Sequence, residues 1–214
     1  MKEGLEDILK KSCQLMAEKG YYGTSVRDLA ETTGRSLAGL YHYFENKEEL
    51  LYLVNHQGFS TLIESAELIA ARSCCAEEKI YRFICNHIHY FVSHRDEMHV
   101  MMLGTQELDS VRGRRIKMLK SKYAGIGVRL VEELLQRANN HSSQDLQRRT
   151  YLLFGMMNWI FGWYSAQKHG SEQELIDDIF HIFLGGALGS EGSLDALTKQ
   201  TIYEEVRNGL RRDH

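Results

Sequence analysis

Proline is absent from this chain of 214 residues, and tryptophan occurs only twice. Because proline lacks an amide hydrogen and breaks helices, its absence permits long uninterrupted helices anywhere in the sequence. Alternating runs of β-branched residues, the usual signal of half-buried strands, are also lacking. The sequence therefore predicts an all-α fold.

The chain also lacks long apolar runs and a strong charge of either sign. Its 26 basic and 29 acidic residues give a net charge of −3. No segment reaches the ~18 consecutive apolar residues of a membrane helix, and the first residues lack the pattern of a secretory signal peptide. We therefore expect a cytoplasmic protein with no membrane partner.

Cysteine is scarce, and its positions do not indicate a redox or metal site. Cys13 shares a helical face with Leu9 and Met16, so we expect a buried, inert side chain. The other three lack the spacing of metal ligands, and a structural disulfide is not expected in a reducing cytoplasm. These are Cys74, Cys75 and Cys85. No metal and no cofactor are expected.

Four histidines lie near one another in the sequence, at positions 87, 89, 94 and 99. His87 and His89 point in different directions on a helix, and no carboxylate or cysteine completes a plausible set of metal ligands. We interpret the histidines as surface or partly buried residues of a helix from about residue 76 to 94. No nucleophile, base and orienting group can be placed together from their spacing, so no catalytic residue is assigned and no enzyme is expected.

The segment 24–50 has the start and stop signals of a helix-turn-helix followed by a third helix. Thr24 is predicted to cap the first helix and Ser36 the second, while Gly34 supplies the left-handed backbone between them. Asn46 is predicted to cap the third, with Glu49 completing something close to a capping box. The residues expected in the core are Val26, Leu29, Ala30, Leu40 and Phe44.

Charge does not support DNA binding by this segment, and any three-helix corner could show the same pattern. Residues 1–50 hold seven basic and nine acidic side chains, a net charge of −2. A basic surface is the usual first sign of a nucleic-acid-binding domain. If the segment binds DNA, the few basic residues must be concentrated near the second helix.

A resemblance to a known family favours DNA binding. The residues that carry it are Thr24, Leu29-Ala30, Gly34, Ser36, Gly39-Leu40-Tyr41, Phe44 and Lys47. In this order and spacing they resemble the N-terminal domain of TetR-family transcriptional repressors. The resemblance covers about the first fifty residues. It implies a three-helix DNA-binding domain at residues 1–50 and a larger helical effector-binding and dimerisation domain at residues 51–214.

The resemblance implies DNA contacts of two kinds. Thr24, Tyr41, Tyr43 and Lys47 match positions that contact phosphate, which fixes the register without reading the sequence. Arg27 matches a position that reaches base edges, where its guanidinium suits guanine O6 and N7.

The remaining implied contacts lie in the turn and at the start of the second helix. Arg35 and His42 could contact either phosphate or bases. The reading helix begins with small or apolar residues, so thymine methyl groups and DNA shape would carry much of the specificity. The full implied set is Thr24, Ser25, Arg27, Arg35, Ser36, Leu37, Ala38, Gly39, Tyr41, His42, Tyr43 and Lys47.

Two helical segments of the larger domain suggest a subunit interface. Residues 151–164 form an aromatic and methionine-rich stretch, predicted to be one helix buried on several sides, in which Trp159 and Trp163 stack. A capping box at Ser171 and Glu174 opens the next helix. In the TetR family the last two major helices typically pair across a twofold axis, so we expect a homodimer. A homodimer would bind an inverted-repeat operator with half-sites about 34–36 Å apart, or a multiple of that spacing.

The effector is the least determined partner. The stretch 112–122 holds six basic and no acidic residues; it is either a solvated helix surface or a site for a multiply charged anion such as phosphate. Together with the aromatic stretch it is similar to the TetR subgroup that responds to acyl-CoA thioesters. The residues implied for effector binding are Arg114, Arg115, Tyr123, Phe154, Asn158, Trp159 and Trp163.

Three alternatives stay open at this point. The aromatic and methionine stripe also fits a plain core, and another apolar or aromatic compound could be the effector. A helical enzyme or binding protein with an incidental helix-turn-helix is a different class of function. The tail 193–214 has amphipathic spacing and predicts an extra helix that either covers the bundle or frays.

Overall fold

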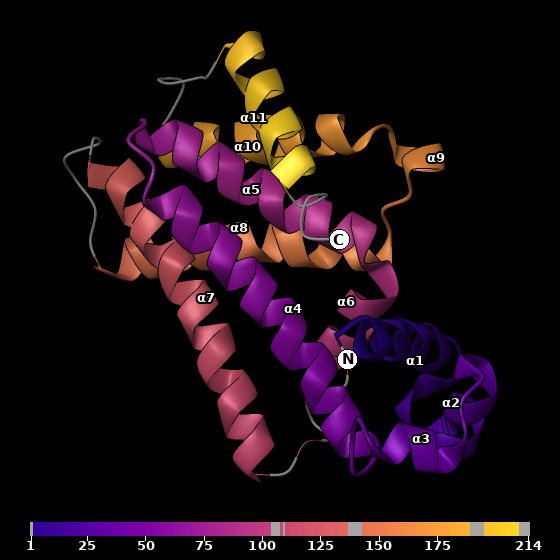
Figure 1. Ribbon diagram of the computed structural model, residues 1–214. Coiled ribbons are helices and arrows are strands. Elements are labelled where there is room, and N and C mark those ends of the chain that lie inside the picture. The colour runs from indigo at the N-terminus through magenta and orange to yellow at the C-terminus, as the bar shows by residue number, and fades with distance from the viewer. Residues whose placement is uncertain (1, 104–107, 109, 137–142, 189–194, 210–214) are drawn as a thin grey trace. The chain divides into compact units, whose positions relative to one another are not determined.

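The computed structural model describes residues 2–103, 108, 110–136, 143–188 and 195–209 (Figure 1). Within these ranges all regular secondary structure is helical, which confirms the all-α prediction. The helices are α1 (Lys2–Gly23), α2 (Val26–Thr33), α3 (Leu37–Tyr41), α4 (Lys47–Ala70), α5 (Ala76–Ser93), α6 (Arg95–Leu103), α7 (Ser110–Gln136), α8 (Ser143–Asn158), the 3₁₀ turn η2 (Trp159–Gly162), α9 (Ala166–His169), α10 (Glu172–Leu188) and α11 (Ala196–Gly209).

The chain divides into two compact units. The first unit contains residues 1–61 and 94–121, and the second contains residues 62–93 and 122–214. The chain crosses between the units inside α4, between α5 and α6, and inside α7, so α4 and α7 each contribute to both units. Each unit has its own buried core.

The core of the first unit is formed where α1 packs against α2 and α6. Leu29, Leu40 and Phe44 are buried, as the sequence predicts, while Ala30 is half-buried. Cys13 is also buried, and burial raises the pKa of its thiol well above the usual value. This cysteine is a core residue, in agreement with the expectation from its helical face.

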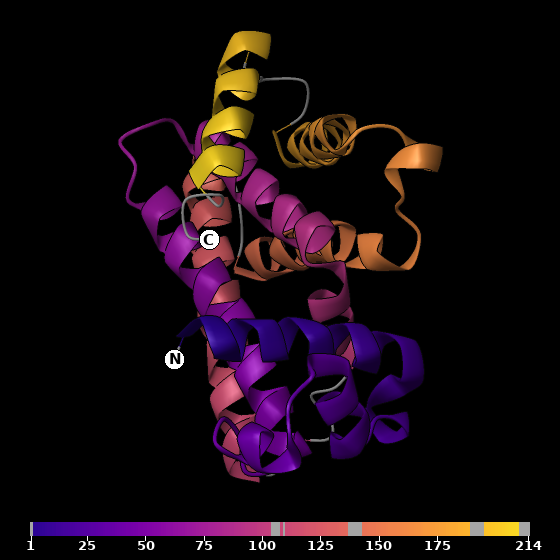
Figure 2. The same cartoon turned by 45° about the vertical axis from the view of Figure 1, so that its right-hand side comes forward.

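The second unit is organised around α5, which packs against α8, α10 and α11. Ile80, Phe83 and Ile84 of α5 and Phe180 of α10 are fully buried. The predicted extra helix at the end of the chain is present as α11, which lies along α5 (Figure 1 and Figure 2). Its Ile202 is fully buried, so α11 covers the bundle; residues 193, 194 and 210–214 of the predicted segment lie outside the described residues.

The predicted helix over residues 151–164 is wrong in its second half. The α-helix α8 ends at Asn158, and a 3₁₀ turn follows. From Asn158 to Gly162 every residue has a helix propensity below that of the Met156-Met157 pair that precedes them. The side chains of Trp159 and Trp163 are 67% and 44% exposed, so the segment is not buried on several sides within the chain, and the two rings do not stack on each other.

Candidate DNA-binding and effector-binding sites

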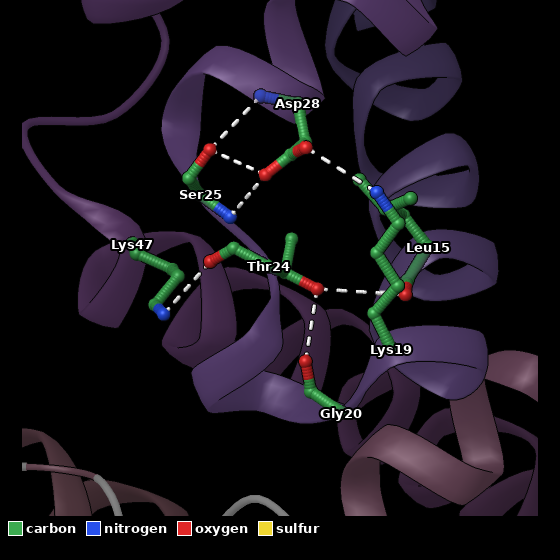
Figure 3. Close-up of polar contacts among 7 residues, drawn as sticks. All are labelled: Leu15, Lys19, Gly20, Thr24, Ser25, Asp28 and Lys47. Atoms are coloured by element: carbon green, nitrogen blue, oxygen red, sulfur yellow. Dashed lines mark hydrogen bonds and ion pairs between the residues drawn. The ribbon is translucent and has the colours of Figure 1, made fainter.

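The first helix of the helix-turn-helix begins one residue later than predicted. Ser25, not Thr24, is the N-cap of α2: its hydroxyl oxygen accepts from the Asp28 amide at 3.1 Å. The Asp28 carboxylate accepts in return from the Ser25 amide at 2.8 Å, which completes a capping box (Figure 3). Hydrogen bonds from the Ser25 hydroxyl and amide lower the pKa of Asp28 to about 2.

Thr24 has an internal role instead. Its side chain is 1% exposed, and its hydroxyl donates to the Gly20 carbonyl at 2.9 Å, with the Leu15 carbonyl at 3.4 Å (Figure 3). The Gly20 carbonyl is among the last four of α1, which lack helical partners. The Thr24 hydroxyl is therefore occupied in joining α1 to α2, and a phosphate contact from it would require breaking these bonds.

The turn and the start of α3 are as the sequence predicts. Gly34 has a φ of 67°, the left-handed conformation that ends α2. The Ser36 hydroxyl accepts from the Gly39 amide at 3.1 Å and so caps α3. Leu40 is then directed into the core, and the opposite surface of α3 is left to solvent.

The exposed surface of α3 consists of small, apolar and aromatic side chains. Leu37 is 39% exposed and Tyr41 is 52% exposed, and Ala38 and His42 are also exposed. Arg27, on the first turn of α2, is exposed as well. The capped α3 helix presents a narrow, uncharged surface beside the accessible Arg27. Such a helix can enter a DNA groove because it brings no acidic side chain that would have to lose its water there.

Arg35 and Tyr43 are less accessible than the sequence suggests. The Arg35 guanidinium carbon lies 5.3 Å from the centroid of the Tyr43 ring, and both side chains are half-buried. They pack against α1 at Gly4, where an added Cβ would come within 2.6 Å of the Tyr43 hydroxyl oxygen. This stack connects the turn to α1, so DNA contacts from these two side chains would come from their outer edges only.

Lys47 connects the start of α4 to the last turn of α1 and to the residue that follows it. Its ammonium group donates to the Thr24 carbonyl at 2.9 Å (Figure 3). It also donates to the Tyr21 carbonyl at 2.8 Å. It also lies 4.3 Å from the centroid of the Tyr21 ring. Asn46 accepts from the Glu49 amide at 2.8 Å, which confirms the predicted cap, whereas the Glu49 carboxylate accepts from Glu45 rather than from Asn46.

In the second unit, two of the predicted effector residues, Tyr123 and the half-buried Phe154, meet in an aromatic cluster. We use "aromatic cluster" for Phe83, His87, Phe91, Tyr123 and Phe154. The Tyr123 and Phe154 ring centroids are 5.8 Å apart, and the His87 ring stacks on Phe91 at 4.4 Å. The edge of the Phe154 ring lies against the backbone of Gly127, where an added Cβ would be 2.9 Å from it.

The aromatic cluster contains a buried polar pair. His87 is 2% exposed, and its Nδ1 lies 2.9 Å from the Tyr123 hydroxyl oxygen, while its Nε2 is buried without a hydrogen-bond partner. Burial lowers the pKa of His87 to about 3, although the nearby Asn158 side chain favours the protonated form. His87 is therefore neutral at physiological pH.

The sequence interpretation of His87 as an ordinary surface or partly buried histidine missed this position. The signal that could have found it is the spacing of Phe83, His87 and Phe91, which are four residues apart and so share one face of α5. A histidine on a phenylalanine face must find a hydrogen-bond partner or be left unsatisfied.

The other predicted effector residues do not join the aromatic cluster. Arg114 and Arg115 are exposed on the part of α7 that belongs to the first unit. Trp159 pairs with Phe161, and Trp163 lies against Tyr164 and His169, after the end of α8. Only Tyr123, Phe154 and Asn158 of the predicted set lie in or beside the aromatic cluster.

Helices α8 and α10 pack together and leave large apolar side chains exposed. Tyr151, Leu152 and Trp159 are 64%, 60% and 67% exposed, and Ile182 of α10 is 66% exposed. Cβ atoms added at Gly155, Gly185 or Gly186 would meet nothing within 4 Å. We call this the α8–α10 face, and apolar exposure on this scale is typical of an interaction surface.

Other kinds of site were also sought among the described residues. None of the described helices is long and apolar enough to cross a membrane. No group of three or more histidine, cysteine or acidic residues in the described part of the chain could hold a metal ion.

Both parts of the chain match known family models. Residues 8–54 match the model described as bacterial regulatory proteins, tetR family, and residues 74–187 match the model of a tetracyclin repressor-like C-terminal domain. A curated relative, the fatty acid metabolism regulator protein of Bacillus subtilis, is 22% identical over 151 residues, 71% of this chain and 78% of that protein.

Solved structures show the same fold. The regulator PfmR from Thermus thermophilus superposes with a TM-score of 0.76 at 25% identity, over 83% of this chain and 96% of that chain. AibR, solved in complex with isovaleryl coenzyme A and operator DNA, gives a TM-score of 0.73 at 21% identity, over 87% of this chain and 98% of that chain. The ketosteroid regulator KstR2 of Mycobacterium tuberculosis gives 0.77 at 18% identity, over 86% and 94%.

Proposed function

The chain belongs to the TetR family of bacterial transcriptional regulators, and we propose that it is a homodimeric repressor released from a palindromic operator by a small-molecule effector. The family consists of regulators rather than enzymes, which favours this function over that of a helical enzyme with an incidental helix-turn-helix. A target on chromosomal DNA would place its action in the cytoplasm.

The observation that carries DNA binding is the capped, solvent-facing α3. With Leu40 buried and Ser36 capping the helix, Leu37, Ala38 and Tyr41 are free to approach the major groove. Arg27 supplies a guanidinium for a guanine edge. Ser25 and His42 complete the exposed contacts. Half-buried positions also contribute, namely Arg35, Gly39, Tyr43 and Lys47, and Thr24 supports them from within the unit.

The α8–α10 face supports the dimer. Its exposed rings and aliphatic side chains are too many for a solvated surface, and the glycines on it let a second helix approach closely. The proposed partner is a second copy of the chain, related by a twofold axis that also orients two α3 helices toward two half-sites.

Footprinting with purified protein, combined with sedimentation, tests operator and dimer together. We expect protection of an inverted repeat whose half-site centres are about one helical turn, 34–36 Å, or a multiple of that apart. A monomer protecting a single asymmetric half-site would overturn the proposal. Replacing Trp159 and Ile182 by serine should yield monomers with the same helical content, and these should protect DNA poorly.

We place effector binding at the aromatic cluster. A buried polar atom without a partner costs roughly 1–3 kcal/mol, so the unpartnered Nε2 of His87 marks a position where a ligand atom would be favourable. If the Tyr123 hydroxyl donates to Nδ1, then Nε2 carries the proton and can donate to a carbonyl oxygen. The ligand end at this position must be uncharged, because His87 is neutral and surrounded by apolar rings.

An acyl-CoA thioester is the effector class we propose. It offers an uncharged carbonyl and an apolar chain, and two of the similar proteins are a regulator of fatty acid metabolism and a regulator solved with isovaleryl coenzyme A. Another apolar or aromatic carbonyl compound is the second candidate, supported by the aromatic lining of the cluster and by the fold shared with a ketosteroid regulator.

Operator release measured against acyl-CoAs of several chain lengths tests this proposal. Free coenzyme A and the free fatty acids serve as matched controls, because each lacks one half of the thioester. We expect release by acyl-CoA alone, and a His87→Phe variant that still binds DNA but needs more ligand. Release by coenzyme A itself, or an unchanged response in His87→Phe, would contradict binding at His87.

A further inference from the structure

We infer that the first turns of α7 bind DNA phosphates next to the operator half-site and so extend the DNA-binding surface beyond the helix-turn-helix. The inference rests on the proposed DNA binding but concerns residues outside residues 1–50. It assigns Arg114, Arg115 and Lys117 to the DNA backbone rather than to a small anionic ligand.

The position of α7 within the first unit supports this assignment. Arg112 Nη1 lies 3.9 Å from a carboxylate oxygen of Glu48, on the first turn of α4. Eight residues further along α7, the Lys120 ammonium lies 5.5 Å from the ring centroid of Phe59, also on α4. The two helices therefore run side by side in the same direction, with the start of α7 beside the start of α4 (Figure 1 and Figure 2).

The start of α4 is itself part of the proposed DNA-binding surface. Lys47, the first residue of α4, directly precedes Glu48, which pairs with Arg112. The first turns of α7 are thus attached to the helix end that adjoins the helix-turn-helix. A phosphate contacted by basic residues at this position would lie near the contacts proposed for the half-site.

The charges on this part of α7 fit a row of phosphates. Arg114, Arg115 and Lys117 are all exposed, and none of them forms an ion pair or hydrogen bond with another described residue. No acidic residue occurs between positions 110 and 131. The N-terminal end of a helix also adds positive potential. Glu48 is paired with Arg112, so the charges of Arg114, Arg115 and Lys117 stay available to phosphates.

The charge balance of the first unit favours DNA binding over the alternative that the basic residues of α7 only form a solvated helix surface. Residues 1–50 are net acidic, with a charge of −2, although DNA-binding domains normally present a basic surface. Residues 110–121 supply five basic side chains and no acid to the same unit. The basic surface missing from the helix-turn-helix segment is therefore present in the first unit, on a helix distant in sequence.

The experiment compares two duplexes and two double variants. One duplex contains only the footprinted inverted repeat, and the other extends it by about 10 base pairs, one helical turn, on each side. Arg114→Gln with Arg115→Gln is compared with Arg129→Gln and Lys168→Gln, which remove the same charge from exposed positions in the second unit. The dissociation constant is measured against salt concentration for each pair.

The wild type should bind the extended duplex more tightly and with a steeper salt dependence than the short one. In the Arg114, Arg115 variant the slope of log affinity against log salt should fall by about 0.9 for each phosphate that is no longer neutralised, about 3.6 for two phosphates on each of two protomers. The control variant should keep the wild-type slope on both duplexes.

Two outcomes overturn the inference. If the Arg114, Arg115 variant keeps the wild-type slope on the extended duplex, these residues do not contact DNA. If it keeps that slope but requires more acyl-CoA for operator release, the arginines hold the phosphates of the ligand instead. Failure of the proposed function itself would look different, because the wild type would then protect no inverted repeat and Arg27→Ala would change nothing.

Discussion

The helix caps of the first unit and the buried polar pairs of the second unit join residues at very different distances in the sequence. In the first unit, the caps at Ser25, Ser36 and Asn46 each accept from an amide three residues ahead. In the second unit, Tyr81 donates to Asp177 at 2.7 Å and Arg82 donates to Glu205 at 2.6 Å. These partners are 96 and 123 residues apart.

This difference shows which structural features can be predicted from neighbouring residues in the sequence. A helix cap and a left-handed glycine are determined by the nearest few residues. The shape of the helix-turn-helix therefore depends mainly on short segments of sequence. A buried arginine or histidine acquires its environment only when distant helices pack around it. The helix-turn-helix can therefore be predicted from sequence, whereas the proposed effector site depends on tertiary structure.

The largest effect expected from a single substitution is in the first unit. Leu40→Ala removes a fully buried side chain that holds α3 against the core. It should lower the free energy of unfolding by about 2–5 kcal/mol, and it should also abolish operator binding. Urea unfolding followed by circular dichroism measures the cost, while fluorescence reports on the second unit, which contains both tryptophans.

Leu68→Ala is the matched control, since that side chain is 68% exposed and its loss should change stability by less than about 0.5 kcal/mol. Identical shifts of the circular dichroism and fluorescence transitions in Leu40→Ala would show that the two units unfold as one, which would weaken the contrast drawn between them.

The pattern of successes and errors in the sequence predictions follows the same contrast. Gly34, Ser36 and the buried Leu29 and Leu40 were predicted correctly because their roles depend on neighbours within one or two helical turns. The cap at Thr24 was wrong by a single residue, since the choice between adjacent hydroxyls depends on the carbonyls of α1 that one of them can reach. Such contacts between helices have no local signal.

In the second unit the residue types were predicted better than their arrangement. Tyr123 and Phe154 do lie together, but His87 was assigned an ordinary role because its partners come from α7 and α8. Arg114 and Trp163 are grouped with them by the resemblance to the acyl-CoA-responsive subgroup, and neither belongs to the aromatic cluster.

Acid should destabilise the second unit through His87. The pKa of His87 is about 3 in the folded protein, against a usual value near 6.5, so the unfolded chain binds the extra proton first as the pH falls. The contribution of neutral His87 to the free energy of unfolding is therefore complete above about pH 6.5. It is lost progressively as the pH falls toward 3, by at most about 1.4 kcal/mol per pH unit.

The measurement is the difference in unfolding free energy between the wild type and His87→Phe as a function of pH. The variant keeps a ring that can stack on Phe91 but cannot be protonated, so the difference should change in favour of the variant as the pH falls below 6.5. A difference that stays constant from pH 7 to pH 4 would mean that His87 is not buried as a neutral side chain.

Two basic residues of the first unit should separate structural from sequence-reading roles. Lys47→Ala removes two hydrogen bonds to carbonyls, so it should lower the unfolding free energy, by about 1.5–3 kcal/mol, and weaken binding to all DNA sequences alike. Arg27→Ala should leave stability within about 0.5 kcal/mol but cost about 1–3 kcal/mol of binding to the cognate operator.

The measurement is affinity for the operator and for a scrambled duplex, with unfolding free energies of both variants. Equal losses on the two duplexes for Arg27→Ala would show that this arginine contacts phosphate rather than a base. An unchanged stability of Lys47→Ala would show that its contacts to the Tyr21 and Thr24 carbonyls contribute nothing in solution.

The smallest predicted effect concerns the capping box of α2 and tests the most local kind of contact. Ser25→Ala should lower the free energy of unfolding by about 1 kcal/mol, whereas Ser25→Gly should lower it by only a few tenths.

The cost of Ser25→Ala should also depend on pH, because the lowered pKa of Asp28 reflects its bonds to Ser25. A carboxyl with a depressed pKa stabilises the fold above its unfolded value, near 4, and that contribution disappears as the pH falls toward 2. Ser25→Ala should therefore differ most from the wild type near neutral pH and least near pH 2. If the same loss is found at both ends of this range, the Asp28 carboxylate takes no part in the cap. The stability of α2 would then depend less on contacts between neighbouring residues than the comparison of the two units implies.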